Sequence, residues 1–366
     1  MSVTRRDVLR TGTALSTVAA FSSLPAWAAF APKPGTWRTF ELITRVEIAK
    51  PAGPMQAWIP LPAYADPAWF KPGGSTWETN AITAEIARDP KYGAEMLYVV
   101  WQEGERAPAV EVRSAFATQS RAVDLSAPTG PHTLSDAERA LNLAPTELIP
   151  TDGIVKETSD RITANAGSDL DKARSIYDWI VEATHRDAAV RGCGLGDIAT
   201  MLQSGNLGGK CADLNALFVG LARAAGLPAR DLYGLRVAPS AFGFASLGAK
   251  NEVVTKAQHC RAEVFLTDFG WVPVDPADVR KVMLEEPPGN LPLGDEKVTE
   301  ARKALFGSWE GNWLAYNAAH DVALPGSRAP ALPFLMYPQA EVKNVRLDCL
   351  DADAFKYALT AREIVT

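Results

Sequence analysis

Hydrophobic and polar positions alternate with a period of two through the first third of the chain. Such alternation is typical of β-strands that bury one face. Gly- and Pro-rich breaks at residues 71–74 and 106–108 separate the alternating runs. The pattern predicts a small antiparallel β-sandwich over residues 35–125, followed by a linker at 126–131. The expected strands are Trp37–Ile48, Met55–Leu61, Ile82–Ile86, Met96–Trp101 and Val110–Thr118.

The period changes after the linker. Apolar residues then recur three and four positions apart, which predicts helices, until the period returns to two from Ala229 onward. A Gly-, Ser- and Ala-rich stretch at 238–257 has no period and is expected to be a mobile loop. The expected helices are Ser135–Leu143, Gly153–Ala164, Leu170–Ala183 and one that starts at Cys211. The expected later strands are Asp231–Val237, Ala262–Leu266 and Trp271–Val274, with further strands near 312–316, 342–350 and 355–365.

The first 28 residues have the features of an export signal. Arg5-Arg6 precedes a weak apolar stretch over residues 13–24, and Ala26-Trp27-Ala28 supplies a cleavage site. This order resembles a twin-arginine signal, with an ordinary secretory signal as the alternative. The protein is therefore expected to be periplasmic or otherwise exported. No later apolar run reaches the ~20 residues of a spanning helix, so no membrane span is expected after signal cleavage.

Composition and charge narrow the function classes. Hydrophobic residues make up 47% and charged residues 22% of the chain, as in globular proteins. The net charge is −6 and no basic stripe interleaves with aromatic residues, so nucleic acid is not an expected partner. No CxxC occurs, and His132, His185 and His320 have no partner at metal-ligand spacing.

The four cysteines would lie in an oxidising compartment if the protein is exported. They are Cys193, Cys211, Cys260 and Cys349. If one is a catalytic thiol, only one disulfide can form among the other three.

Cys211 stands at the start of a strong helical pattern, directly after Gly208-Gly209-Lys210. A cysteine in the first turn of a helix lies near the positive end of the helix dipole and near unsatisfied N–H groups, and both favour the thiolate. The Cys211 N–H could also hold an oxyanion. Taken alone, however, a cysteine beside glycines is more often a packed structural residue.

Two further residues change that interpretation. His259 begins one expected strand, and Asp275 ends the next one, after a tight turn at 267–270. Antiparallel neighbours place the head of one strand beside the tail of the other, so these two side chains are expected to meet. Asp275 would then orient the imidazole, which would take the proton of Cys211. Cys211, His259 and Asp275 are therefore the predicted catalytic triad.

These residues lie in motifs that resemble the bacterial transglutaminase-like domain. The motifs are Gly209-Lys210-Cys211-Ala212-Asp213 with Leu221–Arg230, then His259, then Gly270–Pro276. The resemblance covers about residues 153–280 and implies a papain-like Cys–His–Asp triad on an α+β core, in which helices pack on an antiparallel sheet. A preceding β-domain is common among exported members. The expected organisation is a signal at 1–28, a β-domain at 35–125, a catalytic core at 135–280 and a β-rich extension at 281–366.

The strand that carries His259 departs from the family pattern. The family has His-Ala-Trp-Val-Glu where this chain has His259-Cys260-Arg261-Ala262-Glu263. Because neighbours on a strand point to opposite faces, Cys260 is expected to pack away from the site. Tyr233 and Trp271 could line the cleft, but strand aromatics more often belong to the core.

Polar residues near Cys211 carry weaker signals. Asp213 and Asn215 could cap the helix or face solvent, and capping is favoured for Asp213. Gln203 and Asn206 precede the cysteine, in the region where a papain-like enzyme keeps an oxyanion amide. Their spacing is not a clear match, so loop positions without a catalytic role are favoured.

The triad implies acyl transfer at a carboxamide or peptide carbonyl, without a metal or organic cofactor. The resemblance to exported members favours hydrolysis, so the leading hypothesis is a peptidase or amidase that acts on peptides or proteins in the cell envelope. Two alternatives stay open. One is a cross-linking transglutaminase, and the other is a non-catalytic binding or scaffold protein that reuses the fold.

Overall fold

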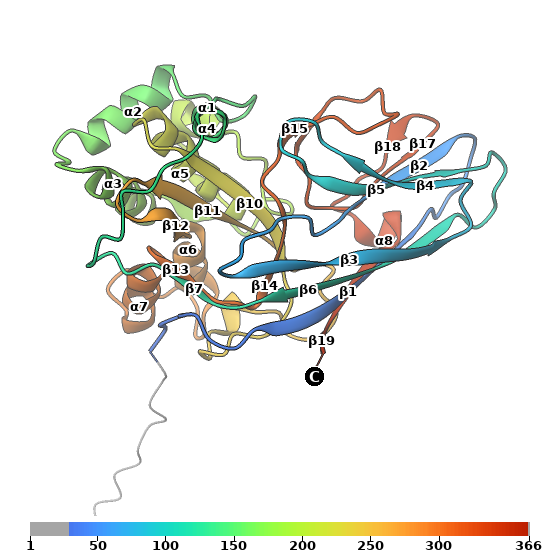
Figure 1. The fold of residues 1–366 in the computed structure, drawn as a ribbon. Helices are drawn as coiled ribbons and strands as arrows, with labels where there is room; N and C mark the ends of the chain where they lie inside the picture. The colour runs from blue at the N-terminus through green and yellow to red at the C-terminus, as the bar shows by residue number, and fades with distance from the viewer. Residues whose placement is uncertain (1–28, 365–366) are drawn as a thin grey trace, which may run out of the picture.

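The structure is a computed structural model that describes residues 29–364. The export signal expected at 1–28 lies outside these residues. Figure 1 shows most helices gathered on one side of the molecule and two β-sheets on the other. None of the helices within the described part of the chain is long and apolar enough to cross a lipid bilayer.

The β-rich side contains two antiparallel sheets, with strand orders β19-β1-β6-β3 and β18-β17-β2-β5-β4. Each sheet contains strands from both ends of the chain, because β1 pairs with β19 and β2 pairs with β17. In Figure 1 the red C-terminal strands lie beside the blue N-terminal ones. The bounds are β1 Arg38–Glu47, β2 Met55–Pro60, β3 Phe70–Thr79, β4 Thr83–Arg88, β5 Glu95–Trp101, β6 Ala109–Thr118, β17 Gln339–Val342, β18 Val345–Arg346 and β19 Tyr357–Ile364.

The predicted break at residues 71–74 is wrong, because these residues belong to strand β3. The pairing of β3 with β6 shifts register between Pro72 and Ser75, and an irregularity of this kind accommodates extra residues without ending a strand. A Cβ at Gly73 would lie 2.9 Å from the carbonyl oxygen of Ala115, so the close approach of the two strands requires glycine there. The Gly-rich sequence therefore marks a strand irregularity.

A third antiparallel sheet, in the order β12-β11-β10-β14, forms the centre of the helical side. Helix α5 packs on β10 and β11 with one side and on α2 and α3 with the other, and all its residues are buried. The predicted turn at 267–270 joins β11 to β12. Helices on an antiparallel sheet confirm the expected α+β class. The bounds are α1 Asp136–Leu143, α2 Gly153–Thr163, α3 Asp169–Ala183, α4 Ile198–Ser204, α5 Cys211–Ala224, β10 Ala229–Arg236, β11 Gln258–Leu266, β12 Gly270–Val274, α6 Pro276–Glu285, α7 Glu296–Ala304 and β14 Trp313–Asn317.

Short elements complete the chain. Three two-stranded pairs join β7 to β13, β8 to β9 and β15 to β16. The stretch 238–257, expected to be a loop, contains the one-turn helix η1. The bounds are β7 Arg121–Ala122, β8 His185–Arg186, β9 Gly208–Gly209, η1 Ala245–Leu247, β13 Ser308–Trp309, β15 His320–Val322, β16 Leu332–Phe334 and α8 Ala352–Phe355.

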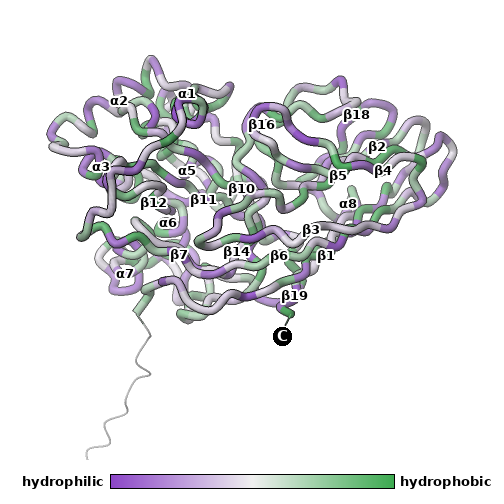
Figure 2. Tube along the Cα trace, in the orientation of Figure 1, coloured by the Kyte–Doolittle hydropathy of each residue, from purple (hydrophilic) through white to green (hydrophobic). Residues whose placement is uncertain are grey.

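One hydrophobic cluster runs through both sides of the molecule. Buried tryptophans meet at the junction: the ring of Trp69, which precedes β3, lies 5.4 Å from Trp309 and 6.1 Å from Trp313. Figure 2 shows hydrophobic stretches, in green, near β2 and β5, and hydrophilic purple stretches on the outer helices α1 and α2. The β-rich side is thus packed onto the helical side through a shared apolar core. This packing also holds the C-terminal segment of the chain next to the helical side.

Candidate active site

Cys211 is the first residue of α5 and is 4% exposed. Its backbone N–H makes no hydrogen bond within residues 29–364, as expected for a donor in the first turn of a helix. The thiol and this free N–H therefore occupy the same helix start. That arrangement favours a thiolate and offers a donor to a developing oxyanion.

Asp213 holds the start of α5 in place. Its carboxylate accepts hydrogen bonds from the backbone of Lys210 at 2.9 Å, of Leu195 at 3.0 Å and of Gly196 at 2.9 Å. The predicted capping role of Asp213 is confirmed. Because two of its donors belong to the preceding loop, the same carboxylate fixes the segment that carries Cys193 against the helix.

The expectation that Asn215 caps the helix or faces solvent is wrong. Asn215 is fully buried and donates hydrogen bonds to the Cys260 carbonyl at 2.8 Å and to Asp275 Oδ1 at 3.2 Å. It lies one turn beyond Cys211, so it faces the sheet rather than the helix terminus. Asn215 thereby links α5 directly to the strands that carry His259 and Asp275.

His259 lies on β11, and Asp275 directly follows β12. Their side chains meet as the hairpin predicts, with His259 Nε2 at 2.7 Å from Asp275 Oδ2. The indole of Trp313 donates to the His259 carbonyl at 3.0 Å and holds the strand at this point. An Nε2–H that donates to Asp275 leaves Nδ1 as the nitrogen available to a thiol.

A second carboxylate and a guanidinium surround this pair, and neither was found from the sequence. Asp278 lies 3.4 Å from His259 Nε2 and receives two hydrogen bonds from Arg236, at 2.5 and 2.7 Å. Asp275 is the N-cap of α6 and accepts from the Asp278 N–H at 3.0 Å. An acidic residue in the first turn after an Asp-Pro start is a recognisable helix signal, which could have indicated Asp278. Nothing in the local pattern indicated Arg236.

The charges of the site favour an ion pair between thiolate and imidazolium. Burial and Arg236 lower the pKa of His259, but Asp278 and Asp275 outweigh them and raise it to about 9. The neighbouring thiols of Cys193 and Cys260, assisted by His259, hold the pKa of Cys211 well below its usual range despite burial. Between these two pKa values the cysteine is negative and the histidine positive, which is the reactive form of a cysteine nucleophile.

Three thiols converge at the start of α5. The sulfur atoms of Cys193, Cys211 and Cys260 all lie within 4.8 Å of one another, and all four cysteines of the chain are free. The expectation that Cys260 packs away from the site is wrong. Strand alternation fixes the direction in which its side chain leaves β11, but not which elements cover that side, and here the Cys193 segment and α5 bring two thiols to it.

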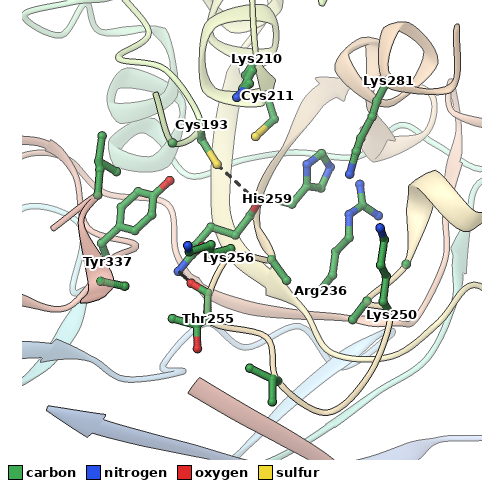
Figure 3. A pocket seen from close by; sticks show the side chains of 18 of the residues that line it. Cys193, Lys210, Cys211, Arg236, Lys250, Thr255, Lys256, His259, Lys281 and Tyr337 are labelled. Carbon is green, nitrogen blue, oxygen red and sulfur yellow. Dashed lines mark hydrogen bonds between the residues drawn. The ribbon is translucent and has the colours of Figure 1, made fainter. Parts of the chain in front are cut away.

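A cleft of about 530 Å³ opens over these groups. Figure 3 shows Cys211, His259 and Arg236 around it, with Tyr337 on the opposite side from Arg236 and Lys281. Residues 248–251, 253 and 255–258 line it, so much of the expected loop 238–257 borders the site. The buried hydroxyl of Tyr337, near the Cys193 thiol, makes no hydrogen bond of good geometry within residues 29–364.

Other residues singled out from the sequence lie elsewhere. Gln203 and Asn206 are exposed and do not border the cleft. Tyr233 is buried and stacks on Phe334 at 4.7 Å, and Trp271 lies under the guanidinium of Arg230 at 3.9 Å. The core interpretation of Tyr233 is confirmed.

Comparison with known proteins identifies the family. The model of the transglutaminase-like superfamily matches residues 156–276, which include Cys211, His259 and Asp275. An uncharacterized protein of Haemophilus influenzae is 35% identical over 326 residues, covering 85% of this chain and 87% of that protein. This chain belongs to the transglutaminase-like superfamily. A solved structure from Cytophaga hutchinsonii, provisionally assigned as a cysteine protease, aligns with a TM-score of 0.50 at 14% identity, over 90% of this chain and 99% of that chain.

In this transglutaminase-like chain, two groups of side chains have the spacing of metal ligands within the described residues. They are the three thiols and the set His259, Asp275 and Asp278. The carboxylates of the second set are already engaged by His259, Arg236 and Asn215. Thiolates suit soft metal ions, but Cys211 would be one of the three ligands, so an ion there would occupy the helix-start thiol.

Proposed function

We propose that this protein is a cysteine-dependent acyl-transfer enzyme, a peptidase or amidase, in which Cys211 is the nucleophile, His259 the acid and base, and Asp275 the residue that orients His259. The observation that carries the proposal is the 2.7 Å contact of His259 with the buried Asp275, since His259 lines the same cleft as Cys211 at its helix start. Superfamily membership and the lowered pKa of Cys211 support it.

The steps use only these groups. The Cys211 thiolate attacks the carbonyl carbon, and the oxyanion that forms is held by the free Cys211 N–H. The carbon–nitrogen bond then breaks, and the leaving amine takes the proton of the His259 imidazolium. Water gives a proton to His259 and attacks the thioester, and the carbon–sulfur bond breaks to release the acid and restore the thiolate.

The location of the substrate follows from the N-terminal sequence. The twin-arginine-type segment at 1–28 supports export. The substrate is accordingly a peptide or protein of the cell envelope.

The test is cleavage of envelope peptides followed by mass spectrometry. The full chain is incubated with an envelope extract, and new peptide termini are compared with those from a Cys211→Ala variant. We expect cleavage by the full chain, none by Cys211→Ala, and normal cleavage by Cys349→Ala, which removes a cysteine outside the cleft. An acyl adduct on Cys211 after acid quenching would identify the intermediate. Equal cleavage by Cys211→Ala would overturn the proposal.

The same samples separate the alternatives. A cross-linking transglutaminase would incorporate a labelled primary amine into a glutamine-bearing acceptor in place of water. A binding or scaffold protein would do neither, and its Cys211 would react with an alkylating agent no faster than an ordinary thiol.

A further inference from the structure

Apart from the Cys211–His259 pair, the charged side chains that line the cleft all carry the same sign. Its charged lining residues within the described chain are Arg186, Lys210, Arg236, Lys250, Lys256 and Lys281, and no Asp or Glu lines it. The protein as a whole carries a net charge of −6. The concentration of cations at the cleft is therefore a local feature rather than a consequence of composition.

Several of these cations already have partners. Arg236 is bound to Asp278 in a buried pair, and Arg186 is paired with Glu285. The Lys210 ammonium donates to the Val190 carbonyl at 2.5 Å. These contacts give the three side chains structural roles and reduce their attraction for a ligand.

Lys256 has a weaker partner. Its ammonium lies 3.7 Å from Asp353, and both side chains are mostly exposed. A surface pair of this kind is worth little. Lys256 therefore adds to the positive potential but is not fixed toward the cleft.

Lys250 and Lys281 remain. Lys250 is exposed and forms no ion pair within residues 29–364. Lys281 lies on α6 at 3.8 Å from Glu285, a carboxylate that it shares with Arg186. Burial and then Arg236 lower the pKa of Lys281, with a further contribution from Arg186. Asp278 and Glu285 act in the opposite direction, but three cations share these two carboxylates, so an anion in the cleft would still be attracted to the group.

The arrangement of the cleft gives this anion a position. In Figure 3 the ammonium groups of Lys281 and Lys250 both point toward the Arg236 guanidinium, beside His259. Tyr337 and Cys193 lie on the other side of the cleft. The cleft therefore has Lys250, Lys281 and Arg236 grouped next to His259, while Lys256 lies between His259 and Tyr337.

The proposed reaction determines which half of a substrate lies on which side of the cleft. In the proposed reaction His259 protonates the leaving nitrogen, so the leaving amine must lie beside His259. We propose that Lys250 and Lys281 form a subsite for a carboxylate carried by the leaving amine, which makes the substrate a peptide or amide cleaved next to an acidic or C-terminal residue. This inference rests on the proposed function and adds the substrate class.

The test uses a pair of alkylating agents that differ only in charge. The full chain reacts at about pH 7 with iodoacetate, which carries a carboxylate, or with neutral iodoacetamide, and modification of Cys211 is followed by peptide mapping. N-Acetylcysteine gives the intrinsic ratio of the two rates. We expect the iodoacetate-to-iodoacetamide ratio at Cys211 to exceed that reference and to fall roughly five- to tenfold in Lys250→Gln/Lys281→Gln.

Two further variants are controls, one for structural damage and one for a general effect of net charge on the alkylation rates. Lys250→Gln alone changes an exposed residue, and we expect about a two- to threefold fall in the ratio. Lys50→Gln/Lys303→Gln removes two exposed charges away from the cleft and should leave both rates unchanged. Raising the salt from about 20 mM to about 500 mM should reduce the difference between wild type and the double variant.

The outcomes separate the two proposals. If Cys211 reacts rapidly with iodoacetamide but the ratio is the same in all variants, the carboxylate subsite is wrong and the nucleophile stands. If Cys211 is no more reactive than N-acetylcysteine toward either agent, the proposed function fails and the subsite fails with it. A ratio that falls equally in the control double variant would also overturn the subsite.

Discussion

His259 Nε2 lies 2.7 Å from Asp275 Oδ2, and the same aspartate also receives hydrogen bonds on Oδ1 from the Asp278 N–H and from Asn215. One buried carboxylate thus joins the imidazole, the start of α6 and the helix that begins with Cys211. Because Asn215 and Cys211 share α5, the position of His259 relative to the thiol is set through a short chain of hydrogen bonds. Asp275 is then expected to act on reactivity through geometry as well as charge.

Asp275→Asn should reduce activity far more than it reduces stability. The amide keeps an oxygen that can cap α6, but it removes the negative charge beside the imidazole and can favour the wrong tautomer. We expect kcat/KM on a cleaved envelope peptide to fall by roughly two to four orders of magnitude. Steady-state kinetics with that peptide measures the change.

Asp295→Asn is the matched control, because Asp295 caps α7 outside the cleft. It should leave kcat/KM unaltered. A loss of activity in Asp275→Asn no greater than in Asp295→Asn would contradict the orienting role.

The reactivity of Cys211 should persist at mildly acidic pH. Its pKa is held well below the usual range by Cys193, Cys260 and His259. An ordinary thiol loses roughly a factor of 100 in thiolate between pH 8 and pH 6, whereas Cys211 should lose only a few-fold in its rate with iodoacetamide. Cys349 provides an internal control, because burial raises the pKa of its thiol. Parallel losses at both cysteines would show that Cys211 is not activated.

At alkaline pH, the changes in activity and stability are expected to depend on His259. Its pKa is raised above the ordinary value to about 9, so its favourable interactions are fully present below about pH 6.5 and are lost as the pH rises through about 9. Asp278 has the opposite sign, because its lowered pKa adds stability above its ordinary pKa that is lost on acidification. Activity should therefore decline above about pH 9, and the free energy of unfolding in urea should decrease toward both extremes. If the unfolding free energy of the wild type depended on pH no more than that of Asp278→Asn, these interactions would not contribute to stability as predicted.

Local patterns predicted the elements of the site better than their surroundings. The helix start at Cys211 and the hairpin that brings His259 to Asp275 depend on residues close in sequence, so periodicity and one tight turn were sufficient. Arg236 and Tyr337 come from distant segments, and no local period indicates which side chain a distant strand will bring to a cleft. The pairing of β2 with β17 escaped prediction for the same reason, since each strand has a pattern that fits many partners.

Cys193→Ala should raise the pKa of Cys211. The neighbouring Cys193 thiol is the largest influence that lowers this pKa, and alanine removes the thiol with little loss of volume. We expect the ratio of iodoacetamide rates at pH 6 and pH 8 to fall several-fold at Cys211. Cys349→Ala, outside the cleft, should leave that ratio unaltered. An unchanged ratio in Cys193→Ala would assign the lowered pKa to Cys260, His259 and the helix start.

Gly194→Ala tests how the loop of Cys193 is locked to the start of α5. Gly194 has φ +89°, and a Cβ there would lie 1.8 Å from Asp213 Oδ2, so the carboxylate that caps the helix would have to move. Gly93 is a matched control, because it has φ +71° but its Cβ would meet nothing within 4 Å. Gly93→Ala should cost only the strain of a left-handed backbone, about 1 kcal/mol of unfolding free energy.

Gly194→Ala should cost at least about 3 kcal/mol, because the strain and the displaced cap combine. It should also slow the reaction of Cys211 with iodoacetamide at pH 6, since the Cys193 thiol would shift with its loop. Urea unfolding and the alkylation rate measure the two effects on the same samples. Equal losses of stability in the two alanine variants, with Cys211 reactivity unchanged, would mean that Asp213 does not hold this loop, and that the thiols of Cys193 and Cys211 are brought together by the packing around Tyr337 instead.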